Sequence, residues 1–308
     1  MANLRYIMAA LALGLIADWG SETLFWSAPL TPNWASVAWG IERLATMFAY
    51  CLACAVALSA VAVTGLGGWR GTFLGGAVMG FMVEGVVVGT MYEAFPIQLV
   101  WTPLAWHALV TGVLVFGLGR MAGRLGPGRM ALAWAALGLA GGYWAQFWPN
   151  ERAQMPGGGT TMLYLAGLGL VVPLAHLGLD RLGQVPRPRA WVMAIVPGMA
   201  LLLWGAQTVA IPSPVRLAMP VMLALTLWAM ARLGQRGAVS FGPPPRRAWH
   251  HGLFLIAPVV AALTAVPGWE YFNGLRANEV IALGTGAVGL SLWGWLLWQA
   301  WRRRAPKV

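Results

Sequence analysis

Charged residues are scarce in this sequence. Only 9% of its 308 residues are Asp, Glu, Lys or Arg, whereas a soluble domain carries about 25%. Hydrophobic residues make up 59% of the chain, and the mean hydropathy is +0.68. So few charges cannot cover a water-facing surface, which excludes a soluble enzyme, a disordered chain and a soluble nucleic-acid-binding module. The composition predicts an all-α, polytopic membrane protein.

Several motifs of cofactor chemistry are also missing. There is no GxxxxGK[ST] sequence for binding ATP, and no HExxH or ExxH spacing that would indicate a metal site. The four histidines do not match in depth as axial haem ligands, because His107 lies in the outer half of a predicted span and the other three lie at the inner edge. Cys51 and Cys54 share one apolar run, where we interpret them as small packing residues. The sequence therefore indicates no metal site and leaves the cofactor unknown.

Long apolar runs predict ten transmembrane helices, since about 20 apolar residues cross the hydrocarbon core of a bilayer. The connections between these runs are short and leave no room for an extramembrane domain. We therefore treat residues 1–308 as a single integral membrane domain, in which 1–125 carry the polar site and 126–308 are mainly scaffold. Two sets of five helices are also compatible with an inverted repeat, a common transporter plan. The predicted spans are 5–25, 41–65, 71–94, 98–119, 129–148, 160–179, 190–211, 215–233, 250–267 and 279–301.

Positive charge alternates between the connections. Sixteen of the 20 Lys and Arg residues fall on one side of the predicted topology, and the other four are Arg43, Arg152, Arg216 and Arg276. The positive-inside rule then places both termini in the cytoplasm of a multi-pass cell-membrane protein, with the bacterial inner membrane as the expected location. The same rule explains the net charge of +11 without a nucleic-acid partner. The predicted partner is the lipid bilayer, with an oligomer or complex partner left open.

Ionisable residues at membrane depth are costly and mark functional sites. Glu84 is the deepest acid, in the third predicted span, and His107 lies about ten residues into the fourth. Counting from the turn at Pro96, with a rise of ~1.5 Å per residue, places both about 15 Å below the outer surface. Adjacent antiparallel helices bring side chains of matched depth together. The sequence therefore predicts an acid–imidazole pair.

Glycines share the helix face of Glu84. Gly76, Gly80 and Glu84 are spaced by four, and Gly85 and Gly89 repeat the spacing on the adjacent face. Such stripes let two helices approach closely or leave space for a ligand. Close packing is the favoured interpretation, because this spacing is common in membrane helices.

A second group of acids lies in the first predicted span. Gly14, Asp18 and Glu22 are spaced by four, so both carboxylates are expected on one face in the outer half. Neither should face lipid. Arg43 opens the second span beside Glu42, and either pairs with that neighbour or supplies the counter-charge to Asp18 and Glu22.

Acidic and aromatic residues at the outer side complete the candidate site. Glu93 ends the third span, and tryptophans are dense around it. An interfacial belt explains most of these rings, and a pocket wall for an apolar or cationic ligand is the alternative. We predict Glu84, His107 and Asp18 as catalytic residues, and Glu22, Glu93, Arg43, Trp101 and Trp106 as substrate-binding residues.

The second half of the chain has fewer polar groups inside its spans. His176, His250 and His251 lie near the inner edge, Asp180 is expected to pair with Arg181 at the interface, and Gln207 is a deep amide in the seventh span. This half is interpreted as scaffold.

Three functions fit these features. A membrane enzyme would use Glu84 in acid–base chemistry on a lipid-like or isoprenoid substrate, in an outer-half cavity with Glu84 at its base. A proton-coupled small-molecule transporter would line a cavity with both halves, and the ten spans and inside termini are similar to the drug/metabolite transporter superfamily. A non-catalytic subunit or assembly factor would have no cavity and a flat apolar face.

One short stretch resembles a known family. Glu84-Gly85-Val86-Val87-Val88-Gly89, followed by Pro96 and Pro103-Leu104-Ala105-Trp106, is similar to part of the membrane carotenoid-biosynthesis hydratases. The similarity covers about 25 of the 308 residues, with a shorter insertion between the two pieces, and nothing else in the chain matches. It implies acid–base chemistry on an isoprenoid.

Overall fold

The computed structural model describes residues 1–24, 36–121, 124–145, 158–235, 239–242, 244–245, 247–272 and 278–303. Within these ranges the chain forms helices and turns, and one isolated antiparallel bridge joins Val185 to Val239. The predicted all-helical class is confirmed. The longer elements are α1 (Ala2–Asp18), α2 (Val37–Thr64), α3 (Gly68–Met82), α6 (Pro127–Ala145), α8 (Gly158–Gly169), α9 (Val171–Leu182), α10 (Ala190–Ala210), α11 (Ala218–Leu233), α12 (Ile256–Phe272) and α13 (Asn278–Arg302). The shorter ones are η1 (Trp19–Thr23), η2 (Val83–Val87), η3 (Thr90–Tyr92), α4 (Ile97–Val100), α5 (Leu118–Arg120), η5 (Pro214–Leu217) and η6 (Ala248–Leu255), and η4 (Trp101–Gly117) joins α4 to α5.

Seven helical segments in the described ranges are long and apolar enough to cross a membrane. They are Val37–Thr64, Ile97–Arg120, Gly159–Leu182, Ala190–Ala210, Pro214–Leu233, Ala248–Gly268 and Glu279–Arg302. These match the second, fourth and sixth to tenth predicted spans. The first, third and fifth fall on α1 with η1, α3 with η2, and α6. The protein is thus a membrane-embedded helical protein, and the count of ten spans stays a prediction.

Helix ends that carry most of the arginines meet on one face, which we call the arginine-rich face. Backbone and side-chain contacts tie its connections together, and the beginning of α1 and the end of α13 both lie there. Which side of the membrane this face occupies stays a prediction, and Arg152 and Arg276 lie outside the described residues. The linking contacts are Arg189 N to Asn3 Oδ1 (3.1 Å), Gln235 N to Gly65 O (3.2 Å), Arg120 Nε to Phe241 O (2.8 Å) and Arg303 Nη1 to Leu233 O (2.7 Å).

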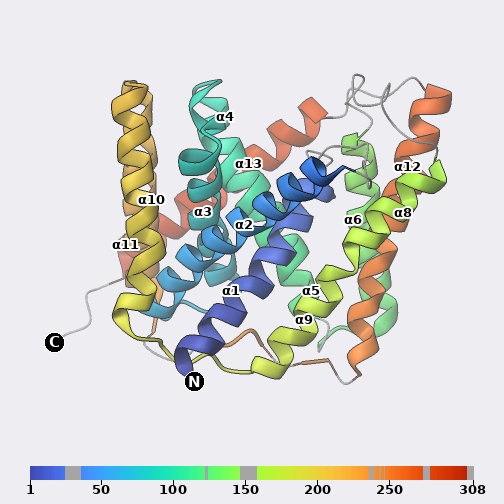
Figure 1. Ribbon diagram of the computed structural model, residues 1–308, viewed down its shortest axis with the longest axis horizontal. Coiled ribbons are helices and arrows are strands. Elements are labelled where there is room, and N and C mark those ends of the chain that lie inside the picture. Colours follow the sequence, from blue (N-terminus) through green and yellow to red (C-terminus); the bar gives the residue numbers. More distant parts are fainter. Residues whose placement is uncertain are drawn as a thin grey trace.

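The helices that carry the predicted site lie in the middle of the bundle. In Figure 1, α10 and α11 form one edge and α8 and α12 form the other, with α1, α2 and α3 between them. α3 packs along η4, and α1 packs along α2. α13 crosses the bundle obliquely and packs on η4 and α11. Residues of α1, α3 and η4 that face these neighbours are largely buried, which gives the site a solid frame.

Three segments of the central helices are wound as π-helices, in which each N–H bonds to the carbonyl five residues earlier. These are η1, η2 and η4. Leu24 N bonds to Trp19 O at 2.9 Å, and Val88 N bonds to Val83 O at 2.9 Å. Such turns are rare and frequently lie at functional sites. The third predicted span also ends earlier than residue 94, because the helix stops at Val87 and Gly89 adopts a φ of +88°.

Candidate functional site

Glu84 and His107 are in direct contact. Oε1 of Glu84 lies 2.7 Å from Nε2 of His107, and Oε2 accepts a hydrogen bond from the hydroxyl of Thr90. The His107 side chain is 1% exposed and that of Glu84 is 14% exposed. The contact expected from their matched depth is present, with the imidazole enclosed and the Glu84 side chain slightly exposed.

Glycines of α3 make this contact sterically feasible. A Cβ added at Gly76 would lie 2.9 Å from the Cα of Ala108. At Gly80 it would lie 2.7 Å from the Cα of Pro103 and 2.9 Å from the Cβ of His107. Real Cβ atoms essentially never come so close to backbone atoms. The stripe therefore serves close packing of α3 on η4, as favoured from sequence, and this packing brings Glu84 to His107.

Two hydroxyls extend the pair on its buried side. Ser21 Oγ lies 3.1 Å from His107 Nδ1 and 2.8 Å from Thr111 Oγ1. Trp106 Nε1 donates to the Ser21 carbonyl at 3.2 Å. The result is a continuous chain from Thr90 through Glu84, His107 and Ser21 to Thr111, which we call the polar relay. Neither Ser21 nor Thr111 was predicted from the sequence.

The polar relay allows two proton arrangements. With a neutral imidazole, Nε2–H donates to an ionised Glu84, and Nδ1 accepts from the Ser21 hydroxyl. With a cationic imidazole, both ring N–H groups donate, and the Ser21 hydroxyl turns to donate to Thr111. Because hydroxyls can reverse their direction, the chain can accept a proton at one end without moving a heavy atom. Ser21, Glu84, His107 and Thr111 all lie in π-wound segments.

The acids of the first span have partners on α2. Asp18 Oδ2 accepts a hydrogen bond from Arg43 Nη2 at 2.5 Å, and both side chains are below 10% exposed. Glu22 Oε1 accepts from the hydroxyl of Tyr50 at 2.6 Å. Arg43 therefore pairs with Asp18 rather than with Glu42, which is exposed. Asp18, predicted as catalytic, lies in this closed ion pair and outside the polar relay.

Glu22 approaches the relay through Tyr50, a residue that was not predicted from the sequence either. The Tyr50 ring centroid lies 6.0 Å from that of His107. Tyr50 is buried and comes from the middle of α2. Close approach of α1 to α2 at Gly14 makes this possible, since a Cβ there would lie 2.5 Å from the Cα of Cys51. Glu22 thus approaches the relay through Tyr50, from whose hydroxyl it accepts a hydrogen bond and whose ring lies beside His107, rather than by direct contact.

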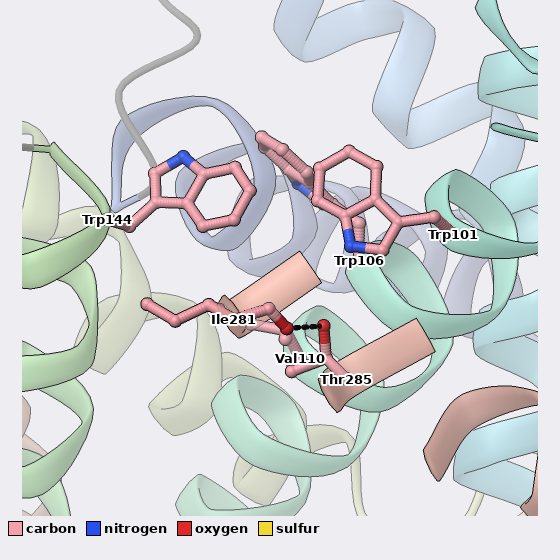
Figure 2. A pocket seen from close by; sticks show the side chains of 6 residues that line it. All are labelled: Trp101, Trp106, Val110, Trp144, Ile281 and Thr285. Atoms are coloured by element: carbon pink, nitrogen blue, oxygen red, sulfur yellow. Dashed lines mark hydrogen bonds between the residues drawn. The ribbon is translucent and has the colours of Figure 1, made fainter. Parts of the chain in front are cut away.

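Trp101 and Trp106 join Trp144 of α6 in an aromatic cluster. The rings of Trp101 and Trp144 stack at 5.3 Å, and Trp106 meets both edge-on. Figure 2 shows the small pocket beneath them, closed on its other side by Ile281 and Thr285 of α13. Its free volume is about 10 Å³, roughly the room that one water needs. The rings therefore line a space of water size, and their predicted role as the wall of a ligand pocket stays a prediction.

Glu93 is exposed at the surface and stays a predicted substrate contact. Glu84 does not line the pocket of Figure 2 or the larger cavity at the arginine-rich face. Among the described residues, no group of three His, Cys, Asp or Glu side chains is arranged to hold a metal ion.

A second buried polar cluster lies near the arginine-rich face. Asp180 contacts Arg120 Nη2 at 2.6 Å and His251 Nε2 at 2.7 Å, so the pair expected between Asp180 and Arg181 is wrong. His176 stacks on His251 with ring centroids 5.3 Å apart. The half of the chain interpreted as scaffold therefore supplies its own polar network. No sequence pattern indicates this network, because its members come from three separate spans.

Gln207 belongs to a third group at the opposite face. Its Oε1 accepts from Arg216 Nη2 at 2.9 Å, and Arg216 Nε donates to Thr208 at 3.1 Å. The guanidinium also lies over the Tyr92 ring at 4.6 Å. Tyr92 donates to the carbonyl of Gly85, the residue after Glu84. The group fixes the turn between α10 and α11 beside the open end of the polar relay.

Comparison with known proteins identifies no family for this chain. No family model, no curated protein and no solved structure matches the chain. The short similarity around Glu84 and Pro103 therefore stays local.

Proposed function

We propose that this protein is a membrane-embedded enzyme in which Glu84 exchanges a proton with a lipid-like substrate. The observation that supports it is the asymmetry of the Glu84–His107 pair. The Glu84 side chain is 14% exposed, whereas the imidazole behind it is 1% exposed and bonded to Ser21. A general acid or base must reach its substrate, and the group that orients it need not.

The surroundings of Glu84 favour an apolar substrate. Val87 and Val88, one turn beyond Glu84, are 47% and 60% exposed. In a helix at membrane depth, such exposed apolar side chains face hydrocarbon. A molecule that approaches Glu84 across them would therefore come from the lipid phase. The local similarity to carotenoid hydratases agrees with an apolar, isoprenoid substrate.

Each member of the polar relay then has a defined part in the proposed chemistry. Glu84 Oε1 or Oε2 gives or takes the proton. His107 holds the carboxyl in place and shares its proton, and Ser21 with Thr111 satisfies the second ring nitrogen in either protonation state. The Asp18–Arg43 pair and the Glu22–Tyr50 contact hold α1 against α2, which keeps Ser21 aimed at His107.

The second candidate is a proton-coupled transporter in the bacterial inner membrane. It is favoured by the helical segment Ile97–Arg120, which carries His107 at one buried cluster and Arg120 at the other. Polar groups at both depths of one helix suit transfer of a proton between the two faces. A subunit of a larger complex would contact its partner through α10 and α13, which are largely uncovered. Only 6% of the most apolar stretch of α10 and 11% of that of α13 is buried inside the protein.

A comparative lipid analysis tests the enzymatic proposal. The chain is produced in a bacterial host that makes isoprenoids, and membrane lipids are compared by mass spectrometry between the wild type, Glu84→Gln and the control Glu42→Gln, which is exposed and outside the predicted site. We expect a lipid whose mass changes with the wild type and the control, and a loss of about 10²–10⁴-fold in its rate of formation with Glu84→Gln. Equal product from all three would remove Glu84 from the chemistry.

Proteoliposomes distinguish transport. Protein in vesicles containing a pH-sensitive dye is exposed to candidate small molecules under an imposed pH gradient. If the vesicles show substrate-driven proton uptake that Glu84→Gln abolishes, and no lipid is altered, the protein is a transporter. Proton uptake that persists in Glu84→Gln would contradict a role for Glu84 in either function.

A further inference from the structure

A polar cavity of about 430 Å³ opens on the arginine-rich face, away from Glu84. It is open to the surface and bordered by the turn from α2 to α3, the end of α11 and the end of α13. Its volume lies within the range of about 300–1,000 Å³ that small-molecule sites have. The side chains and backbone that matter for its chemistry are Gly65, Gly67, Arg70, Gln235 and Arg303.

Arg303 is held in position by the protein itself. Its Nη1 donates to the carbonyls of Arg232 and Leu233, at 3.0 and 2.7 Å, which cap the end of α11. In return, Arg232 Nη2 donates to the Arg303 carbonyl. This reciprocal clasp fixes the guanidinium at the cavity by neutral acceptors, so its positive charge is not cancelled.

In the described part of the chain, no acidic side chain forms an ion pair with either arginine of the cavity. The chain has nine Asp and Glu residues, and Asp180 is the single one that the topology assigns to this side. Asp180 is already bonded to Arg120 and His251. A polar cavity with two uncompensated guanidinium groups is suited to an anion, and arginine binds phosphate oxygens with particular geometric fit.

An aromatic shelf lies beside the cavity. The rings of Trp69 and Trp295 stack at 5.7 Å, and Arg70 lies 5.9 Å from the Trp69 ring centroid. Trp298 is contacted by Arg302 in the same manner at 4.4 Å. All three tryptophans are 41–45% exposed on the outer surface of the bundle. Exposed tryptophans at helix ends mark the boundary between headgroups and acyl chains.

We propose that this cavity binds the phosphate headgroup of an anionic phospholipid, with Arg70 and Arg303 on the phosphate and the acyl chains along Trp69, Trp295 and Trp298. Basic pockets between transmembrane helices bind such headgroups in other membrane proteins. The site is independent of Glu84, and it would anchor the ends of α3, α11 and α13 to the leaflet on this side.

Native mass spectrometry of the full-length protein in detergent tests the proposal. Phosphatidylglycerol, phosphatidylcholine and glycerol phosphate are titrated against the wild type and the variant Arg70→Gln/Arg303→Gln. The control is Arg129→Gln/Arg187→Gln, which removes the same charge from exposed positions of the same face. Arg70→Gln alone is included because it leaves the clasp of Arg303 intact.

We expect the wild type and the control to retain phosphatidylglycerol over phosphatidylcholine. The double variant at the cavity should bind phosphatidylglycerol about 30-fold more weakly, and Arg70→Gln about fivefold more weakly. Equal weakening by the control would show a diffuse effect of surface charge and overturn the assignment. Binding of glycerol phosphate as tight as that of the lipid would instead assign the cavity to a soluble phosphate ester.

Discussion

Gly80 offers a direct test of whether helix packing holds the Glu84–His107 pair together. In Gly80→Ala the new methyl group would lie 2.7 Å from the Cα of Pro103 and 2.9 Å from the Cβ of His107. To reach an ordinary contact of 3.4 Å, η4 must retreat from α3 by about 0.7 Å. If His107 moves with its helix, its Nε2 lies roughly 3.4 Å from Glu84, beyond the usual hydrogen-bond distance.

The same substitution has a calculable effect on stability. Forcing a methyl group against backbone atoms costs about 1–3 kcal/mol, and replacing a helical glycine by alanine returns about 1 kcal/mol. The neighbours of Gly80 are rigid, so we expect a net loss of about 1–2 kcal/mol. Gly75 is the matched control on the same helix, because a Cβ there would meet only Val61 at an ordinary 3.4 Å. Gly75→Ala should be neutral or stabilising.

Two measurements report the outcome. Thermal unfolding in detergent reports stability, and ¹⁵N NMR of histidine-labelled protein reports the hydrogen bonds of His107, assigned by His107→Gln. We expect Gly80→Ala to lower the unfolding temperature and shift the Nε2 signal, and Gly75→Ala to leave that signal unchanged. A wild-type Nε2 signal in Gly80→Ala, or an equal disturbance of the pair by Gly75→Ala, would refute this reasoning.

Two further predictions concern the other buried groups. Arg43→Gln should lower the free energy of unfolding by about 3–5 kcal/mol, because Asp18 is left buried without a counter-charge. In chemical unfolding, adding Asp18→Asn should recover part of this loss. The control Glu42→Gln, at an exposed position, should have little effect. Gly119→Ala places a Cβ 2.2 Å from Nε2 of His176, so the imidazole ring must move. The NMR signals of His176 should therefore shift, while those of the distant polar relay stay unchanged. Unaltered His176 signals would show that Gly119 and His176 are not in close contact.

The contact between Glu84 and His107 could be predicted from the sequence because few variables decide it. Both residues lie on consecutive antiparallel helices, and their distances from the turn at Pro96 are similar. The helical rise then predicts similar depths, although the helix of Glu84 ends at Val87 and the chain from there to Pro96 is not one continuous helix. The glycines on the same helix face as Glu84 also indicate that the two helices pack closely. Depth and face together bring the side chains together without knowledge of any other helix.

Ser21 and Tyr50 could not be predicted in the same way. A regular helix places Asp18 and Glu22 on one face, and both acids do face α2, where they contact Arg43 and Tyr50. The π turn of η1 adds a residue to the helical turn and rotates the residues after it, so Ser21 points to His107. Nothing in the residue types around Ser21 indicates such a turn, because it depends on packing against η4.

The Asp18–Arg43 and Glu84–His107 pairs provide an internal comparison for the proposed function. A buried ion pair is weak evidence for stability, since apolar residues of similar volume often do as well. Asp18–Arg43 is closed on both sides, as expected of a pair that fixes one helix on another. Glu84–His107 differs, because the imidazole is sealed and bonded at both ring nitrogens, while the Glu84 side chain is 14% exposed and lies near exposed valines. The Asp180–His251 pair has almost the same exposures, 13% and 2%, so exposure of the acid alone does not separate the two roles. The exposed valines beside Glu84 are the feature that favours proton exchange with a molecule in the membrane.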